Sequence, residues 1–517
     1  TLDEDLIVIG TDDGLVQITT NGGESWRKVD NIPGAPSQSY VNAVYTSQHN
    51  ENVIYVVFNH HKYGDFRPYV FMTKDKGNTW SSISSNLPSR GSVYAIEEDH
   101  LDPGLIFCGT EFGVFFSPDN GGIWKELSKG LPTIAVRDIA IQREMSDLVL
   151  GTFGRGFYVL DDYSLLRNIE NKSISQNAMI LPTRDAIMWE KASPLGLPGK
   201  AFQGDNFYTA DNLDPVAMIS YYYDKNYKSI RDQRQEKEKG LIKDKKDVFY
   251  PDYDALKAEM DEDEAKLLFT VKNSDGLVVK KVFKSPSKGF NRFHWDLRYE
   301  VTNPINLSSS SFYNPFAGVS EGTLVEPGTY TVQMDYFVDG ESTTLVDAKE
   351  FTVSLLDNTV LPAEDKEAKV RFQRDVARLQ GEISSYSRIL SEIGDKVKYF
   401  EVAVLRLEKP IEELSSQMKK VKDDLRDINT LFYGDNVKRR LDMQQIPTPS
   451  SRVGIIANEQ KYSTAAPTGT HVNSLMIAKE EFLPLKSRVD ALVKNVKNIE
   501  DKMKSLGAPY TPGRYEN

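Results

Sequence analysis

Three copies of one short motif constrain the fold of this sequence more than any other feature. Residues 19–26 read TTNGGESW, residues 73–80 read TKDKGNTW and residues 117–124 read SPDNGGIW, so all three fit the pattern Ser/Thr-x-Asp/Asn-x-Gly-x-x-Trp. Short β-rich runs such as VIYVVF, YVFMT and LIFCG surround them, with turn residues in between. Copies spaced about 50 residues apart and built from short strands and turns predict an antiparallel all-β repeat.

The motif itself is explained by the physics of a tight turn. Its Asp or Asn side chain can accept backbone N–H groups in the turn, and its Gly can supply a positive φ. The Trp that closes each copy can pack its ring against the neighbouring repeat. A carboxylate held by its own backbone is a poor catalyst, so we interpret the motif as structural. The residues concerned are Asn21, Trp26, Asp75, Trp80, Asp119 and Trp124.

These copies resemble the Asp-box of bacterial-neuraminidase-type (BNR) repeats. Such repeats build β-propellers of four-stranded blades in sialidases, sortilin-type receptor domains and xyloglucan-type glycoside hydrolases. The run from GSVYAIEEDH (residues 91–100) to GTFGRGFYVLDDY (residues 151–163) resembles bacterial sortilin-like proteins, often labelled "glycosyl hydrolase, BNR repeat". The resemblance covers residues 1–163 and, more loosely, the rest of the chain. It implies a propeller outside the cytoplasm of a Gram-negative bacterium, in the periplasm, at the outer-membrane surface or secreted. It implies no single function, because propellers host many activities.

The direction of the strands predicts which end of the propeller carries function. The Asp-box joins the third strand of a blade to the fourth, and antiparallel strands alternate ends. The turns GTDDG (residues 10–14), GTEFG (109–113) and GTFGRG (151–156) should therefore lie at the opposite end. In the family the Asp-boxes mark the face away from the ligand. If the protein is an enzyme, the candidate carboxylates at the opposite end are Asp12, Asp13, Asp65 and Glu111.

One turn at that end exceeds the minimum length. NHHKYGDFRP, residues 59–68, holds two His, a Lys, an Asp, an Arg and two aromatic residues. Such a loop can be a solvated extended hairpin, or it can contact a glycan or peptide at the rim of the propeller. The candidate ligand-binding residues of this loop and of the turns beside it are His60, His61, Lys62, Asp65, Arg67, Arg90, Arg137 and Arg155.

The number of blades predicts that the natural ring is larger. Residues 1–163 supply three strands of one blade, two complete blades and three strands of a last blade. A closed propeller needs at least about four blades. We therefore expect an upstream propeller portion, either in a longer protein or in a separate chain.

The rest of the chain predicts two further modules. After a connector at residues 164–203, strand-like runs over residues 204–357 predict a β-sandwich, and PGTYTV and KGFNRFHWDLR resemble small immunoglobulin-like domains of bacterial surface proteins. A charged insert at residues 224–266 predicts one or two exposed helices; its MDEDE run lacks the Asp/Gly spacing of a calcium loop.

Residues 358–517 predict an antiparallel, coiled-coil-like bundle of three helices. Their apolar residues recur in steps of four and three. A reversal is expected near Lys409–Pro410, with Gly394 as the alternative, and residues 434–470 are expected to form a long polar loop. The bundle can pack within the chain or dock a second protein. The fold class predicted is therefore multidomain and mainly β plus α: a partial propeller, a sandwich and a helical bundle.

Composition excludes several functional classes. The net charge of −12 with scattered Lys and Arg argues against a nucleic-acid surface. No apolar run approaches the ~18 residues of a membrane span. Cys108 is the only cysteine, and the six His lack zinc-enzyme spacing, so we predict no metal and no cofactor.

Two functions stay open at this point. One is an extracytoplasmic binding or scaffold protein whose propeller face binds a peptide, a protein or a glycan. The other is a glycoside hydrolase of the sialidase or xyloglucanase type, which would need paired carboxylates across a cleft. A sialidase would also need an Arg cluster and a Tyr nucleophile, and only a fragment of its Phe-Arg-Ile-Pro pattern is present, at residues 66–68. The sequence favours binding.

Overall fold

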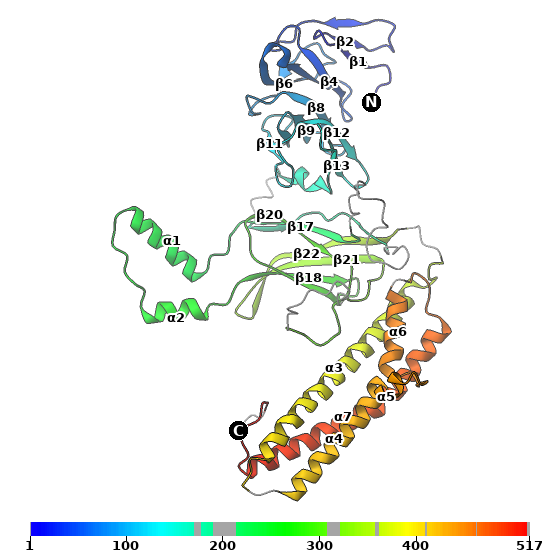
Figure 1. Cartoon of the computed structure of the whole chain (residues 1–517). Coiled ribbons are helices and arrows are strands. Elements are labelled where there is room, and N and C mark those ends of the chain that lie inside the picture. Colours follow the sequence, from blue (N-terminus) through cyan, green and yellow to red (C-terminus); the bar gives the residue numbers. More distant parts are fainter. Residues whose placement is uncertain are drawn as a thin grey trace. The chain divides into compact units, whose positions relative to one another are not determined.

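The protein is a mixed α/β multidomain chain in this computed structural model, with mostly antiparallel sheets and a C-terminal helical region (Figure 1). The structure describes residues 2–169, 177–189, 214–307, 321–356, 361–408, 411–461 and 463–513. Residues 170–176 and 190–203 of the expected connector, and residues 204–213 at the start of the expected sandwich, lie outside this range. The chain forms two compact units. The first comprises Thr1–Arg184, Ile219–Glu262 and Pro286–Arg292, and the second comprises Asp185–Met218, Asp263–Ser285 and Phe293–Asn517.

The first unit begins with four successive antiparallel sheets, and each is built from strands adjacent in sequence. The first sheet holds β1 (Ile7–Gly10), β2 (Val16–Thr19) and β3 (Arg27–Val29). The second holds β4 (Tyr40–Thr46), β5 (Ile54–His60), β6 (Asp65–Thr73) and β7 (Ser81–Ser82). The third holds β8 (Val93–Glu98), β9 (Ile106–Thr110), β10 (Gly113–Ser117) and β11 (Lys125–Glu126). The fourth holds β12 (Val136–Gln142), β13 (Asp147–Thr152) and β14 (Phe157–Leu160).

The repeated turns, residues 19–26, 73–80 and 117–124, use one hydrogen-bond pattern. In the second copy the Asp75 carboxylate accepts the Thr79 backbone N–H at 2.8 Å and the Thr73 hydroxyl at 2.7 Å, while the Thr73 hydroxyl accepts the Gly77 N–H at 2.9 Å. Asn21 and Asp119 make the matching bonds in the first and third copies. Hydrogen bonds from Thr79 and Thr73 lower the pKa of Asp75 to about 2, so this carboxyl is ionised at neutral pH and cannot serve as a general acid.

The second and third repeated turns also pack on the sheet before them. A Cβ on Gly77 would lie 2.3 Å from Ile18 in the first sheet, and a Cβ on Gly121 would lie 2.6 Å from Ile83 at the end of the second. Both glycines have positive φ, +86° and +88°, which other residues rarely adopt. Trp124 is only 3% exposed and donates its ring N–H to the Ile83 carbonyl at 2.7 Å. Trp26, in the first sheet, is 40% exposed.

At the other end of the strands, glycines let the next sheet approach. A Cβ on Gly10 would lie 2.3 Å from Val41, and a Cβ on Gly109 would lie 2.6 Å from the Val136 carbonyl oxygen. A side chain at Gly10 or Gly109 would therefore force the first strand of the next sheet to shift. The first glycine of the GTDDG and GTEFG turns is therefore required for packing between sheets.

A 3₁₀ helix, η2 (Tyr163–Asn168), follows the fourth sheet and leads to a three-stranded sheet. That sheet has the order β15 (Ala178–Ile180), β17 (Ala217–Tyr223) and β20 (Gly289–Trp295). The Arg292 guanidinium in β20 donates to the backbone carbonyls of Asp161 and Asp162 at 2.9 and 2.7 Å, which fastens this sheet to the end of the fourth sheet.

The charged insert contains two helices, α1 (Ile230–Lys243) and α2 (Tyr253–Asp261), and neither has a buried residue. Arg234 in α1 holds the two together, because it pairs with Glu238 at 2.7 Å and with Glu259 of α2 at 2.5 Å.

The second unit contains a five-stranded sheet and most of the helices. Its strand order is β16 (Ala186–Met188), β22 (Glu341–Leu355), β21 (Gly328–Val338), β18 (Lys266–Asn273) and β19 (Val278–Lys284), and only β16 pairs in parallel. Trp295 packs its ring 5.3 Å from Tyr330 and 6.0 Å from Phe351. A buried aromatic group therefore anchors this sheet.

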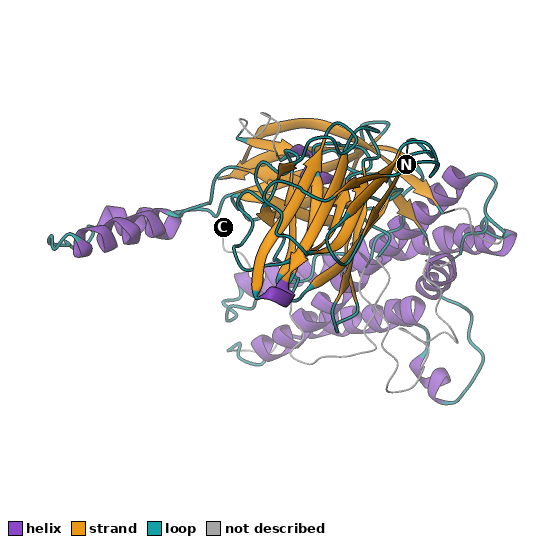
Figure 2. Ribbon diagram, turned by 90° about the horizontal axis from the view of Figure 1, so that it is seen from above, coloured by secondary structure: helices purple, strands orange, loops and turns teal. Residues whose placement is uncertain are grey.

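Among the described residues, four helices, which Figure 2 draws in purple, share one apolar core. They are α3 (Lys366–Val404), α4 (Glu412–Tyr433), α6 (Pro449–Lys461) and α7 (Gly469–Ser505). The short helix α5 (Asn436–Arg440) has no buried residue. The apolar residues predicted at steps of four and three are largely buried in α3, α4 and α7. Helix α3 runs through Gly394, so the reversal falls between α3 and α4; Lys409 and Pro410 themselves lie outside the described residues.

The expected loop at residues 434–470 is a point of difference, because it contains α5 and α6. Val453 and Ile456 of α6 are buried in the core of the helices. Two such residues in a polar segment flanked by prolines give too weak a periodic signal to predict a helix, and tertiary packing decides the outcome.

We expect Gly109→Ala to lower the free energy of unfolding of the four sheets by roughly 1–3 kcal/mol, because the added methyl group overpacks against Val136. Gly91→Ala is the matched control, since its nearest neighbour would be an ordinary 3.7 Å away. Thermal melting of both variants checks this. Equal melting temperatures for the two would contradict the assigned close approach.

Candidate functional site

The turn face is the end of the four sheets that lies opposite the repeated turns. We define it by the turns at residues 11–15, 61–68, 111–112 and 153–156 and by the segments that enter β4, β8 and β12. Backbone bonds join it across sheets: the Val41 N–H donates to the Thr11 carbonyl at 3.1 Å, and the Gly91 N–H donates to the Phe66 carbonyl at 2.9 Å. The turns therefore form a continuous surface.

Three of the four candidate carboxylates on the turn face have partners. Asp65 pairs with Arg67 at 2.7 Å and accepts the Tyr69 hydroxyl at 2.7 Å, and these hydrogen bonds, chiefly those from Arg67, hold the pKa of Asp65 well below its usual range. Glu111 accepts the Tyr94 hydroxyl and lies 3.7 Å from the Arg137 guanidinium. An ion-paired carboxylate is a poor proton donor or nucleophile.

The remaining pair lies in one turn of the first sheet. Asp13 accepts the hydroxyl of Thr11 and so closes its own turn. Asp12 beside it is exposed. Because Asp12 lies next to Asp13 in the same short turn, the two carboxylates cannot face each other across a cleft. The described residues therefore bring no free pair of candidate carboxylates together.

Two of the binding candidates in residues 59–68, His60 and Lys62, lie next to aromatic rings. His60 lies 4.4 Å from the Tyr63 ring, nearly parallel to it, and its Nδ1 is 3.0 Å from the Ser39 hydroxyl. Lys62 lies 5.8 Å from the centre of the Tyr40 ring. His61 contacts the side chain of Asn59. The loop is thus folded on itself and on the segment that enters β4.

Arg137 forms the second such group. Its guanidinium lies 3.7 Å from the centre of the Tyr94 ring and 5.3 Å from that of Phe153. Burial, and then the hydrogen bond to Glu111, raises the pKa of Tyr94 to about 12. Arg90 and Arg155, the other predicted cations, are exposed on the same face.

The exposed aromatic residues of the turn face were not among the predicted binding residues. Tyr63 is 62% exposed, Phe112 is 51% exposed and Phe153 is 70% exposed. Phe112 and Phe153 occupy the GTEFG and GTFGRG turns, so the repeated Phe next to the turn glycine was the available signal. Exposed aromatic side chains beside cations are typical of surfaces that bind other molecules.

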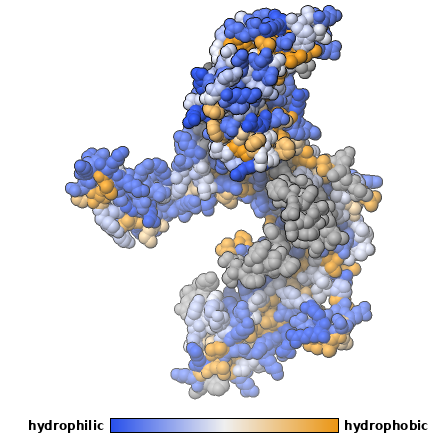
Figure 3. Space-filling model, turned by 45° about the horizontal axis from the view of Figure 1, so that its top comes forward, coloured by the Kyte–Doolittle hydropathy of each residue, from blue (hydrophilic) through white to orange (hydrophobic). Residues whose placement is uncertain are grey.

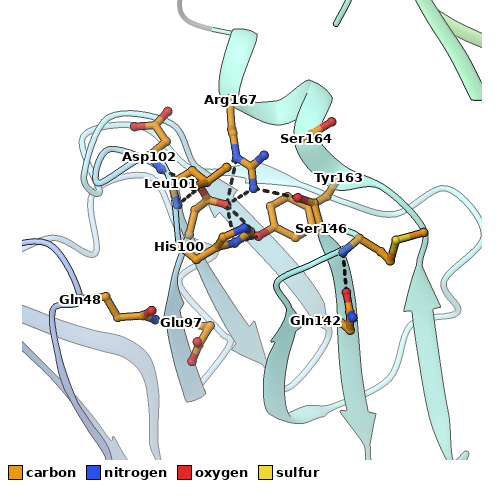
Figure 4. Close-up of polar contacts among 12 residues, drawn as sticks. Gln48, Glu97, His100, Leu101, Asp102, Gln142, Ser146, Tyr163, Ser164 and Arg167 are labelled. Atoms are coloured by element: carbon orange, nitrogen blue, oxygen red, sulfur yellow. Dashed lines mark hydrogen bonds and ion pairs between the residues drawn. The ribbon is translucent and has the colours of Figure 1, made fainter. Parts of the chain in front are cut away.

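A buried polar cluster that no sequence motif predicts lies at the opposite end of β8 (Figure 4). The Asp99 carboxylate is fully buried and accepts hydrogen bonds from Arg167 at 2.7 and 2.9 Å and from the Tyr163 hydroxyl at 2.7 Å. Burial acts to raise the pKa of Asp99, but the bonds from Arg167 and Tyr163 outweigh it, and the pKa lies below its usual value. This satisfied cluster fastens η2 to the third sheet.

Glu97, two residues earlier, has a different environment. Burial is the main cause that raises the pKa of its carboxyl to about 7, against the hydrogen bond from the Tyr45 hydroxyl at 3.3 Å. Burial also raises the pKa of Tyr45 to about 12. A tyrosine next to a carboxylate could in principle serve as a nucleophile, but a raised pKa makes the hydroxyl less reactive.

The described residues show no group of His, Cys, Asp and Glu that could hold a metal ion. Cys108 is buried in the third sheet, and burial raises the pKa of its thiol. Among the helices that the structure describes, none is long and apolar enough to span a bilayer.

Comparisons with known proteins give weak matches to solved structures. No family model and no curated protein matches the chain. YCF48 bound to a D1 peptide is similar at 19% identity and a TM-score of 0.26, over 31% of this chain and 49% of that one. An ancestral GH74 enzyme is similar at 14% identity and a TM-score of 0.26, over 65% of this chain and 37% of that one. The GH74 xyloglucanase from Xanthomonas campestris is similar at 11% identity and a TM-score of 0.26, over 72% and 46%.

These weakly matching structures are β-propeller proteins, and the chain spans less than half the length of each. They include both a peptide-bound protein and enzymes, so no function of this chain follows from them.

The raised pKa of Glu97 predicts a pH dependence of stability. The unfolded chain loses this proton near pH 4.5, whereas the folded chain keeps it to about pH 7. The folded state therefore binds more protons in that window, and its stability should fall as the pH rises from 4.5 to 7. Glu97→Gln stays neutral, so at pH 8 it should be more stable than the wild type by roughly 1–2 kcal/mol, with allowance for partial solvent exposure.

Melting temperatures of both proteins between pH 5 and pH 8 check this, with Glu126→Gln on the exposed strand β11 as the control. A difference between Glu97→Gln and the wild type that does not grow with pH would contradict the raised pKa of the half-buried Glu97.

Proposed function

We propose that the protein is a binding or scaffold protein whose turn face holds a peptide, a protein or a glycan. In this proposal the four sheets are blades of an Asp-box β-propeller of the sortilin-like type, and an upstream propeller portion, in the same protein or a separate chain, extends the ring. The five-stranded sheet belongs to an immunoglobulin-like sandwich, and the coiled-coil-like helices form a docking module. We also propose that it acts outside the cytoplasm.

The observation that carries the proposal is the contrast between carboxylates and aromatic residues on the turn face. Asp65 and Glu111 are occupied by Arg67 and Arg137, whereas Phe112 and Phe153 are largely exposed. Acid–base catalysis needs free carboxyl groups at a suitable pKa. Binding needs apolar area to bury and polar groups beside it to orient the ligand.

The side chains of the turn face also favour a binding partner. On the side of the molecule that Figure 3 shows, hydrophobic residues lie in small groups among hydrophilic ones. On the turn face the exposed rings of Phe153 and Tyr40 lie next to the cations of Arg137 and Lys62, which suits a moderate contact with a partner.

The alternative is a glycoside hydrolase, and one observation supports it. Tyr45 and Glu97 lie 3.3 Å apart, and a carboxyl with a pKa of about 7 is suited to proton transfer. Two observations weigh against it. The Tyr45 hydroxyl has a raised pKa, and the pair lies on strands toward the repeated-turn end, not among the exposed aromatic residues of the turn face.

Phe153→Ala should weaken capture of the ligand about 10-fold or more, because an exposed aromatic anchor typically carries over 1 kcal/mol of binding free energy. The measurement uses the full chain on glycan and peptide arrays, followed by titration of the strongest binder. Ile123→Ala is the matched control, because Ile123 is 52% exposed on a repeated turn at the opposite end.

Loss of binding in Ile123→Ala but not in Phe153→Ala would place the ligand at the repeated turns and contradict the proposal. Hydrolysis of an array glycoside that Glu97→Gln abolishes would favour the enzyme instead.

A further inference from the structure

A groove in the second unit lies apart from everything described so far. It is a cavity of about 650 Å³ lined by residues 298–303 and 321–324, by strand β19 and by helices α3 and α6. Its volume is within the range of small-molecule sites in proteins. We call it the basic groove, because the residues that line it include Arg298, Arg374, Arg378 and Lys461 but only two carboxylates.

The walls of the basic groove are fixed by direct contacts. The Thr302 hydroxyl donates to the Ala377 carbonyl in α3 at 2.7 Å. A Cβ on Gly381 would lie 2.4 Å from the Thr302 carbonyl oxygen, so only glycine lets α3 approach this closely. The Tyr299 N–H donates to the Thr323 carbonyl at 2.9 Å. A groove with rigid walls can present its side chains in fixed positions.

One cation in the groove has no anionic partner within the described part of the chain. The Arg374 guanidinium stacks 4.3 Å from the centre of the Tyr299 ring, and among the described residues no carboxylate lies within ion-pair distance of it. Arg298 and Lys461, in contrast, both pair with Glu321, at 3.4 and 3.3 Å. Stacking orients the guanidinium and leaves its N–H edge available for a carboxylate, which it can hold through two bonds.

A buried acceptor lies in the same lining. Gln460 of α6 is 4% exposed, and its Oε1 receives no hydrogen bond from any residue that the structure describes. Its Nε2 is 3.1 Å from Nδ1 of His471, and its backbone carbonyl accepts from the Gln373 side chain at 2.9 Å. Buried polar atoms are almost always paired, so an unpaired one calls for an explanation.

We propose that the basic groove binds a small acidic saccharide. A uronic acid places a carboxylate next to hydroxyl groups. The carboxylate would pair with Arg374, and a neighbouring hydroxyl would donate to Gln460 Oε1. Gln380 and Asn458, which also line the groove, can both donate and accept, as hydroxyl groups require. The apolar side chains of Val278 and Val301, which also line the groove and are 50% and 37% exposed, offer surface for a sugar ring. This site is independent of the turn face and of its proposed function.

The test is calorimetric titration of the full chain with digalacturonic acid as the probe. The wild type should bind it and should bind the neutral disaccharide cellobiose at least about 10-fold more weakly. Arg374→Gln should lower the affinity for digalacturonic acid about 10-fold or more. Arg371→Gln is the matched control, because it makes the same charge change on α3 at an exposed residue that pairs with Glu367 and does not line the groove. Its affinity should equal that of the wild type.

Gln460→Leu is the second variant, in case Arg374→Gln is poorly folded. It removes the unpaired acceptor and should also lower the affinity. No binding of digalacturonic acid up to its solubility limit would overturn the proposal. So would equal weakening in Arg371→Gln, equal affinity for cellobiose, or binding of a tripeptide with a free carboxyl terminus in place of the saccharide.

Discussion

Contact between one sheet and the next is the constraint on which the rest of the first unit depends. At one end, the absence of a Cβ on Gly77 and Gly121 lets the repeated turns pack directly against Ile18 and Ile83. At the other end, Gly10 and Gly109 in the same way let Val41 and Val136 of the next sheet's first strand approach closely. Close contact at both ends sets the spacing of the sheets and holds their turns in register. The turn face is therefore a continuous surface, although it is made of separate hairpins.

The two ends of the strands differ in how their side chains are used. Polar groups at the repeated-turn end hold the structure together, whereas the turn face carries exposed side chains. The carboxylate of Asp75 is committed to its own turn and has a pKa of about 2. The buried Asp99 cluster, which fastens η2, is likewise fully satisfied. Exposed aromatic and cationic groups are instead gathered on the turn face, where Arg137 bridges Tyr94 and Phe153. In the second unit, two residues of the basic groove depart from this pattern. Among the described residues, no carboxylate pairs with the Arg374 guanidinium, and Gln460 Oε1 accepts no hydrogen bond.

The repeats made much of the first unit predictable. A motif that occurs three times predicts the turn around Asp119 and the orientation of the strands beside it. Pairings that depend on tertiary packing were not predictable. Glu111 and Arg137 come from different sheets, and nothing in their local sequence couples them. Helix α6 was missed because its two buried residues, Val453 and Ile456, give no periodic run. The raised pKa of Glu97 follows from burial, and the alternation of apolar and polar residues along β8 does not predict that burial.

Hydrogen–deuterium exchange of the full chain, with and without its captured ligand, tests the central claim most directly. If the turn face binds, amides in residues 61–68, 111–113 and 153–156 should exchange more slowly with ligand, and amides of the repeated turns at 73–80 and 117–124 should not change. Protection confined to the repeated turns, or to the strands around Tyr45 and Glu97, would contradict the account.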